Sequence, residues 1–187
     1  MTDESLLRKV AAQIGAPPSY AGGGVKGSIL TVAAASYGAR PTTEEITQPT
    51  GFDPQAAALF EAVVEAAFLV ANADGEFDDT ERDAFQHVVL AACQGTVAEG
   101  QVAALLADLA DQLDEDGLDK RVSMVGRTIN KPEHAREVLR VAALLAQVSG
   151  GVSESERSVL AKLASEFQLG TGAVDTAIGE VSKALAD

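Results

Sequence analysis

The chain has almost no cysteine, histidine or tryptophan, and these shortages exclude several kinds of functional site. Cys93 is the only cysteine, so no disulfide can form within the chain. The two histidines, His87 and His134, stand far apart, and no His or Cys pair has the spacing of a structural zinc motif. No nucleophile stands beside a base in the sequence, so we expect no enzymatic activity.

Basic residues are scarce as well. The chain has 14 Lys and Arg residues against 28 Asp and Glu residues, and its formal net charge is -14. Such an acidic chain repels the phosphate backbone of nucleic acids and anionic lipid surfaces. We therefore expect no nucleic-acid partner. Cations, or a protein partner with a basic surface, fit this charge; the oligomeric state is left open.

Long hydrophobic runs are missing too. The apolar run at residues 29–35 is too short to span a bilayer, which takes about 20 residues. The amino-terminal residues 1–5 are acidic rather than basic, unlike a secretory leader. We therefore predict a cytoplasmic protein without direct membrane insertion.

Alanine, leucine and valine make up most of the apolar residues, which are 47% of the chain, whereas aromatic residues are only 4%. Alanine and leucine favour helices, and alanine lets helices approach closely. The sequence predicts an all-α helical bundle. Helical periodicity and capping signals such as Thr96 and Asn130 place about seven core helices over 53–73, 78–93, 96–113, 118–129, 130–148, 154–167 and 171–185.

Residues 1–52 differ from the rest and are predicted as an N-terminal extension to the helical domain of residues 53–187. Residues 15–52 contain seven of the 17 glycines and four of the six prolines, which is typical of loops or weakly ordered structure. Short helices are predicted at 3–14, 28–36 and 43–47.

The chain matches itself at an offset of 75 residues, so that residues 71–82 align with residues 146–157. The two repeats cover about 54–94 and 132–168. Each contains a glycine at a helix end, followed by a capping box, Asp78-x-x-Glu81 in the first copy and Ser153-x-x-Glu156 in the second. We expect the two copies to pack about a pseudo-two-fold axis, with the helices at 53–73 and 130–148 in the centre.

Carboxylates are concentrated in the first copy only. Asp74 and Glu76 of the first copy correspond to Ser149 and Gly151 of the second. Neighbouring carboxylates repel one another unless water or a cation separates them, and such oxygen-rich clusters suit Ca²⁺ or Mg²⁺. The alternative is a solvated acidic loop that binds no specific metal.

The spacing Asp74-Gly75 followed by five residues and Glu81 also matches the latter part of an EF-hand loop. In that reading Asp78 stands at the ninth loop position. The first position falls on Val70, which has no side-chain oxygen.

The stretch from Leu69 to Phe77, together with Glu81-Arg82, resembles the signature of the tellurite-resistance TerB-like family. The second copy is similar but has Ser149 where that family often has Asp. The resemblance covers about 53–185. It implies a duplicated all-α fold without enzymatic activity, a role in tellurite and stress resistance, divalent-metal binding through surface carboxylates, and cooperation with a membrane-embedded TerC-type partner.

These observations together predict a divalent-cation site that contains Asp74, Asp78 and Glu81. Asp74 and Glu81 match the family motif, and Asp78 is added as an oxygen donor on the same turn. The leading hypothesis is a cation-binding helical adaptor of stress response. The alternatives are a metal-independent acidic interaction scaffold, supported by a second acidic stretch at residues 108–119, and an EF-hand-like calcium sensor.

Overall fold

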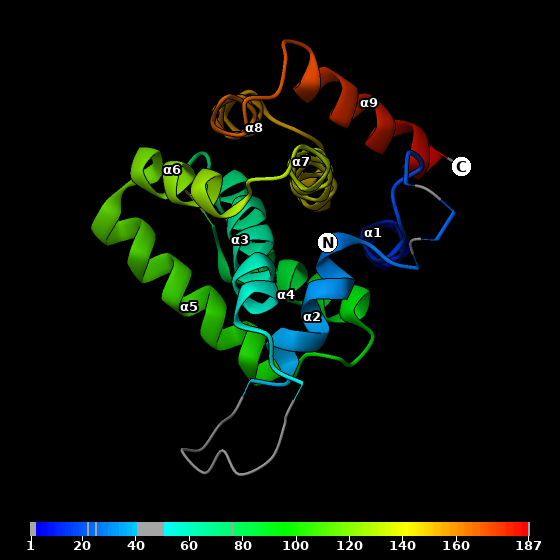
Figure 1. The fold of residues 1–187 in the computed structure, drawn as a ribbon. Coiled ribbons are helices and arrows are strands. Elements are labelled where there is room, and N and C mark those ends of the chain that lie inside the picture. The colour runs from blue at the N-terminus through cyan, green and yellow to red at the C-terminus, as the bar shows by residue number, and fades with distance from the viewer. Residues whose placement is uncertain (1–2, 22, 25, 41–50, 76, 187) are drawn as a thin grey trace.

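The computed structural model describes residues 3–21, 23–24, 26–40, 51–75 and 77–186 (Figure 1). Within these ranges all regular secondary structure is helical, which confirms the predicted all-α class. The helix predicted at 43–47 lies outside the described residues. The elements are α1 (Glu4–Gly15), α2 (Ile29–Gly38), α3 (Pro54–Ala71), α4 (Asp79–Cys93), α5 (Glu99–Asp116), α6 (Leu118–Thr128), α7 (Pro132–Ala146), the 3₁₀ turn η1 (Gln147–Ser149), α8 (Glu154–Glu166) and α9 (Ala173–Ala186).

Local signals explain where α3 begins. The side chain of Asp53 accepts a hydrogen bond from the Gln55 backbone N–H at 2.9 Å, and Pro54 occupies the first turn. Proline is favoured there because the first N–H groups of a helix have no partner within it. The predicted start of this helix is therefore confirmed.

Two predicted caps are wrong. α5 starts after Ala98 rather than at Thr96, because the Gln101 side chain reaches back and accepts from the Ala98 backbone N–H at 3.0 Å. α7 starts after Lys131, which has an extended backbone and makes no side-chain cap. Asn130 therefore stands one residue too early to cap it.

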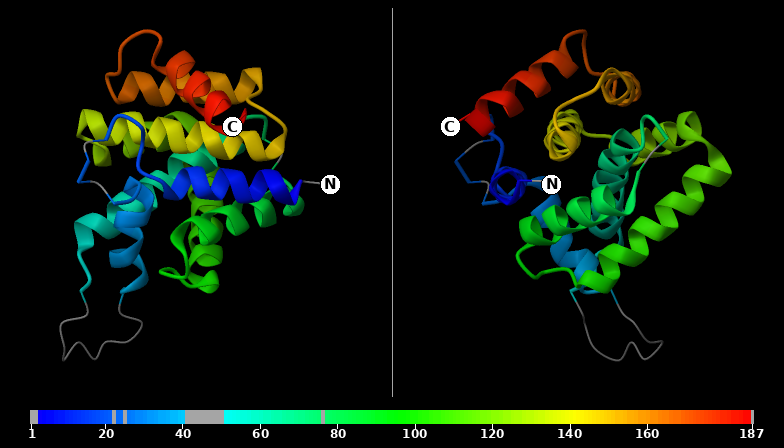
Figure 2. Two further views of the ribbon diagram at one scale, coloured as in Figure 1. Left: turned by 90° about the vertical axis from the view of Figure 1, so that its right-hand side faces the viewer. Right: turned by 180° about the vertical axis from the view of Figure 1, so that it is seen from behind.

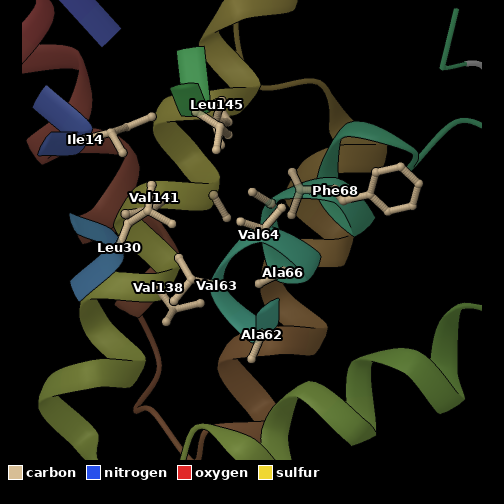
Figure 3. Packing of buried hydrophobic residues seen from close by; sticks show 14 of the residues in the cluster. Ile14, Leu30, Ala62, Val63, Val64, Ala66, Phe68, Val138, Val141 and Leu145 are labelled. Carbon is tan, nitrogen blue, oxygen red and sulfur yellow. The ribbon is translucent and has the colours of Figure 1, made fainter. Parts of the chain in front are cut away.

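α3 and α7 form the centre of the molecule and pack on each other. Figure 3 shows Val63 of α3 beside Val138 and Val141 of α7, and all three side chains are buried. α3 carries apolar residues around almost its whole circumference, and residues 141–146 of α7 are buried on all sides, so both helices are stable only when other elements cover them. The surrounding helices therefore arrange themselves around this pair.

α3 is the one described helix that is long and apolar enough to cross a membrane, but 61% of its apolar window is buried inside the fold. Its neighbours are α2, α5, α6, α7 and α8. A central core helix has the same length and composition as a membrane span. The burial of α3 explains its apolar sequence without a bilayer.

Helices α1 and α2, which precede residue 53, contribute to the same core. α1 packs against α4 and α7, and α2 packs against α3 (Figures 1 and 2). Val10 and Ile14 of α1 and Leu30 and Ala34 of α2 are buried in the cluster that holds α3 and α7. The helix α2 thus lies inside the Gly- and Pro-rich stretch of residues 15–52 and is part of the core.

Two buried charged side chains of α7 fasten these amino-terminal helices. Glu137 accepts a hydrogen bond at 2.6 Å from the backbone N–H of Ile29, the first residue of α2. Arg140 donates to the carbonyl oxygens of Gln13 and Ala16 at 3.1 and 3.2 Å, where α1 ends. Each contact satisfies backbone groups that a helix terminus leaves without a partner.

The central helices α3 and α7 are the aligned first helices of the two repeats (Figure 1). The aligned second helices differ in their packing: α8 packs on α3, α7, α6 and α9, whereas α4 packs mainly on α1 and α5. The exact pseudo-two-fold relation remains a prediction.

Candidate functional site at the paired corners

The first corner, residues 72–78 with Glu76 not described, connects α3 to α4. The side-chain amide of Asn72 donates to the Phe68 carbonyl oxygen at 3.3 Å and closes the end of α3. Gly75 has φ +80° and donates its N–H to the Asn72 carbonyl oxygen at 3.0 Å. Glycine suits this left-handed angle because it has no Cβ to clash with the backbone. The chain therefore turns tightly just where its carboxylates gather.

The capping box predicted for α4 is present. Asp78 Oδ1 accepts from the Glu81 backbone N–H at 2.8 Å, and Glu81 Oε2 accepts from the Asp78 backbone N–H at 3.3 Å. These reciprocal bonds hold the two carboxylates on one turn of the chain. They also use one oxygen of each carboxylate for a backbone amide.

The second corner, residues 147–153, repeats this geometry between α7 and α8. Gly150 has φ +111°. The Ser153 hydroxyl accepts from the Glu156 backbone N–H at 3.2 Å, and Glu156 Oε2 accepts from the Ser153 backbone N–H at 2.7 Å. Both predicted capping boxes are thus confirmed.

The two corners face a common cavity of about 330 Å³, which we call the corner cavity. Its walls come from the start of α1, the ends of α3 and α7, the start of α4 and both corners. The lining residues are Asp3, Leu6, Ala71, Phe77, Glu81, Ala84, Phe85, Leu145, Val148, Ser149 and Gly150. Phe77 packs edge-to-face on Phe68 and Phe85, with ring centroids 5.5 and 5.9 Å apart. This aromatic contact holds the first corner against the core.

Glu156 and Asp74 bring the charges of the two corners together. The Glu156 side chain is buried, and burial raises the pKa of its carboxyl above the usual value. The negative charge of Asp74 raises this pKa further, while hydrogen bonds from Ser153 and Ser149 lower it. Two carboxylates from opposite repeats thus repel each other, an arrangement that a positive charge would relieve.

The structure places the three residues predicted to bind the cation on two successive turns of the chain. Asp78 and Glu81 share the capping box, whereas Asp74 lies on the preceding turn, where its charge acts on Glu156. Among the described residues no three His, Cys, Asp or Glu side chains lie close enough to hold a metal ion. Sequence reasoning did not select Glu156, although its capping-box position in the aligned repeat was the signal that could have found it.

These donors do not form the closed cage of six to eight oxygens that Ca²⁺ prefers. Mg²⁺, by contrast, uses one or two carboxylates and keeps several waters. Val70 would be the first ligand position of an EF-hand, yet it is fully buried inside α3. The structure therefore disfavours the EF-hand-like alternative.

Two other sequence features have their places in the fold. Cys93 is buried in the core, and burial raises the pKa of its thiol to about 12, so the reactive thiolate is suppressed. Asp108, Asp111 and Asp114 of α5 are exposed on the outside of the molecule. They form an acidic outer face that is separate from the corner cavity.

A family model described as "Tellurite resistance protein TerB" matches residues 60–179. The chain belongs to the TerB family. The match begins inside α3, ends inside α9 and includes both corners, so the resemblance inferred from the motif is confirmed. No curated protein and no solved structure gave a significant match. The helix α1, which lines one side of the corner cavity, lies before the part that matches TerB.

Proposed function

We propose that this TerB-family protein is a non-enzymatic, cytoplasmic adaptor of the stress response that binds a divalent cation at the first corner. Asp78 and Glu81, which share the capping box, are the proposed direct ligands, and Asp74 is proposed to attract the cation from the preceding turn. The observation that supports the proposal is the capping box, which holds the Asp78 and Glu81 carboxylates on one turn by bonds of 2.8 and 3.3 Å to backbone N–H groups. A cation at this corner would also relieve the repulsion between Asp74 and the buried Glu156.

Mg²⁺ is the favoured ion, with Ca²⁺ second. The capping box uses one oxygen each of Asp78 and Glu81, so a bound ion takes the remaining oxygens and completes its shell with water. The cation then neutralises part of a surface whose net charge is -14 and changes how that surface meets its partners. We propose a partner with a basic surface, such as a membrane-embedded TerC-type protein.

Calorimetric titration of the full chain with Mg²⁺, Ca²⁺, Mn²⁺ and Zn²⁺ tests the cation site. We expect saturable binding by Mg²⁺ and at least a tenfold weaker affinity after Asp74→Asn, which preserves the shape of the side chain but removes its charge. Asp111→Asn is the matched control, because Asp111 is exposed on α5 away from the corners. The site is refuted if titration of the unchanged protein shows no heat of binding, or if Asp74→Asn and Asp111→Asn bind the cation with equal affinity.

The metal-independent scaffold is the second candidate, and the acidic outer face of α5 favours it. Carboxylates on this exposed face attract a basic protein without any bound ion. In this case partner binding withstands EDTA but falls as salt is raised. Loss of partner binding in EDTA at low salt argues against this candidate and for the cation-dependent one.

A further inference from the structure

We propose that the corner cavity is an anchor pocket for an apolar side chain of a protein segment in which Lys or Arg residues flank that side chain. The inference rests on the partner role proposed above and names the chemistry of the partner. It does not require the cation, so the two ideas can fail separately.

The inner walls of the corner cavity are apolar. Leu6, Ala84, Phe85 and Leu145 contribute carbon surface from three different elements. A volume of about 330 Å³ stands at the lower end of the range for ligand pockets, about 300–1,000 Å³. The cavity therefore suits one or two side chains better than a large cofactor.

The rim of the corner cavity is acidic. Asp3 and Glu81 line it, and no Lys or Arg is among its lining residues. Both carboxylates are held in place: Asp3 caps α1 by accepting from the Ser5 backbone N–H at 2.9 Å, and Glu81 belongs to the capping box of α4. A fixed negative rim around an apolar interior selects a ligand that is apolar in its centre and cationic at its edge.

Charge and shape together favour a protein segment over the other occupants. A second copy of this chain carries the same net charge of -14 and is repelled. An apolar anchor residue in a pocket supplies most of the affinity of many interfaces, while flanking charges speed association and fix orientation. An amphipathic segment with Leu or Phe between Lys and Arg residues provides both.

The corner cavity also differs from a site made by the two repeats alone. Asp3 and Leu6 belong to the amino-terminal end of α1, outside the residues that match TerB. α1 is fastened at its other end by Arg140, which donates to the Gln13 and Ala16 carbonyl oxygens. The pocket is thus completed by a helix that packs on α4 and that Arg140 of α7 holds at its other end.

The test uses a fluorescein-labelled peptide with a central Leu between pairs of Lys and Arg residues, and a matched peptide with Ser in place of Leu. Fluorescence anisotropy is measured with the full chain in EDTA, so that no divalent cation contributes. We expect saturable binding of the Leu peptide and at least tenfold weaker binding of the Ser peptide. Absence of saturable binding, or equal binding of the two peptides, overturns the proposal.

Two variants locate the binding. Ala84→Leu fills the pocket and should weaken binding at least tenfold, whereas Ala104→Leu makes the same change on the exposed face of α5 and should leave it unchanged. Asp3→Asn preserves the helix cap but removes a rim charge, so it should weaken binding a few-fold even if Ala84→Leu fails to fold. The proposal is overturned if Asp3→Asn leaves the affinity for the Leu peptide unchanged. It is also overturned if light scattering shows that the unchanged protein forms dimers and that Asp3→Asn abolishes them.

The cation titration separates this inference from the proposed function. If the peptide binds in EDTA but the calorimetric titration with divalent cations shows no heat of binding, the anchor pocket is supported and the cation site is refuted. If the titration shows a saturable heat of cation binding but the peptide does not bind, the cation site is supported and the anchor pocket is overturned.

Discussion

Replacement of Arg121 by Met should show how much one buried ion pair contributes to the free energy of unfolding. Arg121 of α6 donates its Nε–H to Glu65 Oε1 of α3 at 2.6 Å, and only 8% and 10% of the two side chains is exposed. A second bond joins Arg121 to Asp116 at 3.1 Å, but Asp116 also pairs with Lys120. Arg121→Met keeps an apolar stem of similar length and leaves Glu65 buried without its partner.

The expected loss is large compared with the stability of a domain. Removal of one partner from a buried ion pair costs about 3–5 kcal/mol, because the remaining charge is uncompensated. Domains of this kind unfold with a free energy of about 5–15 kcal/mol. Urea unfolding followed by circular dichroism should therefore show a much lower midpoint with an unchanged slope.

The loss should depend on pH. Burial raises the pKa of Glu65 in the folded protein, and the hydrogen bond and charge of Arg121 oppose that rise. Without Arg121 the folded-state pKa rises further above the unfolded value. A carboxyl with a raised folded-state pKa binds its proton more tightly when folded, so stability is greatest below the unfolded pKa and falls as pH rises through the folded pKa. The penalty of Arg121→Met should thus be smaller at pH 5 than at pH 8.

An exposed ion pair whose carboxylate also lies on α3 provides the control. Arg40 and Glu61 are 3.0 Å apart, but their side chains are 51% and 35% exposed. Arg40→Met should therefore cost less than about 1 kcal/mol. Glu65→Gln in the Arg121→Met background should recover at least half of the loss. The reasoning is refuted if Arg121→Met loses no more stability than Arg40→Met, or if its penalty is the same at pH 5 and pH 8.

Two further predictions concern packing and reactivity. A Cβ on Gly38 would lie 2.0 Å from the Thr96 carbonyl oxygen, so Gly38→Ala should destabilise the fold by about 1–3 kcal/mol in urea unfolding. Gly100→Ala is the control and should not destabilise the fold, because a Cβ on Gly100 meets nothing within 4 Å. Cys93 should resist iodoacetamide at pH 8 in the native protein and react in urea, because burial raises the pKa of its thiol to about 12; native labelling at the unfolded rate would contradict this.

Much of the fold follows from local patterns along the chain. The helix predicted at 53–73 is found as α3, Pro54–Ala71, because its cap, its proline and its apolar periodicity are all short-range signals. Both capping boxes were predicted for the same reason, since their partners are three residues apart. The caps predicted at Thr96 and Asn130 were wrong because the helices start after Ala98 and Lys131, which make no side-chain cap, so the local capping signal is missing at both starts.

The sequence by itself therefore determined the helical class, the repeated corners and the acidic balance, because periodicity, capping and charge depend on neighbouring residues. Only the tertiary structure decided that the charge of Asp74 acts on Glu156 of the other corner, and that Arg121 pairs with Glu65. It also decided that α1 completes the corner cavity. Such contacts join residues far apart in the chain, and their formation depends on how whole helices pack, which no local pattern specifies.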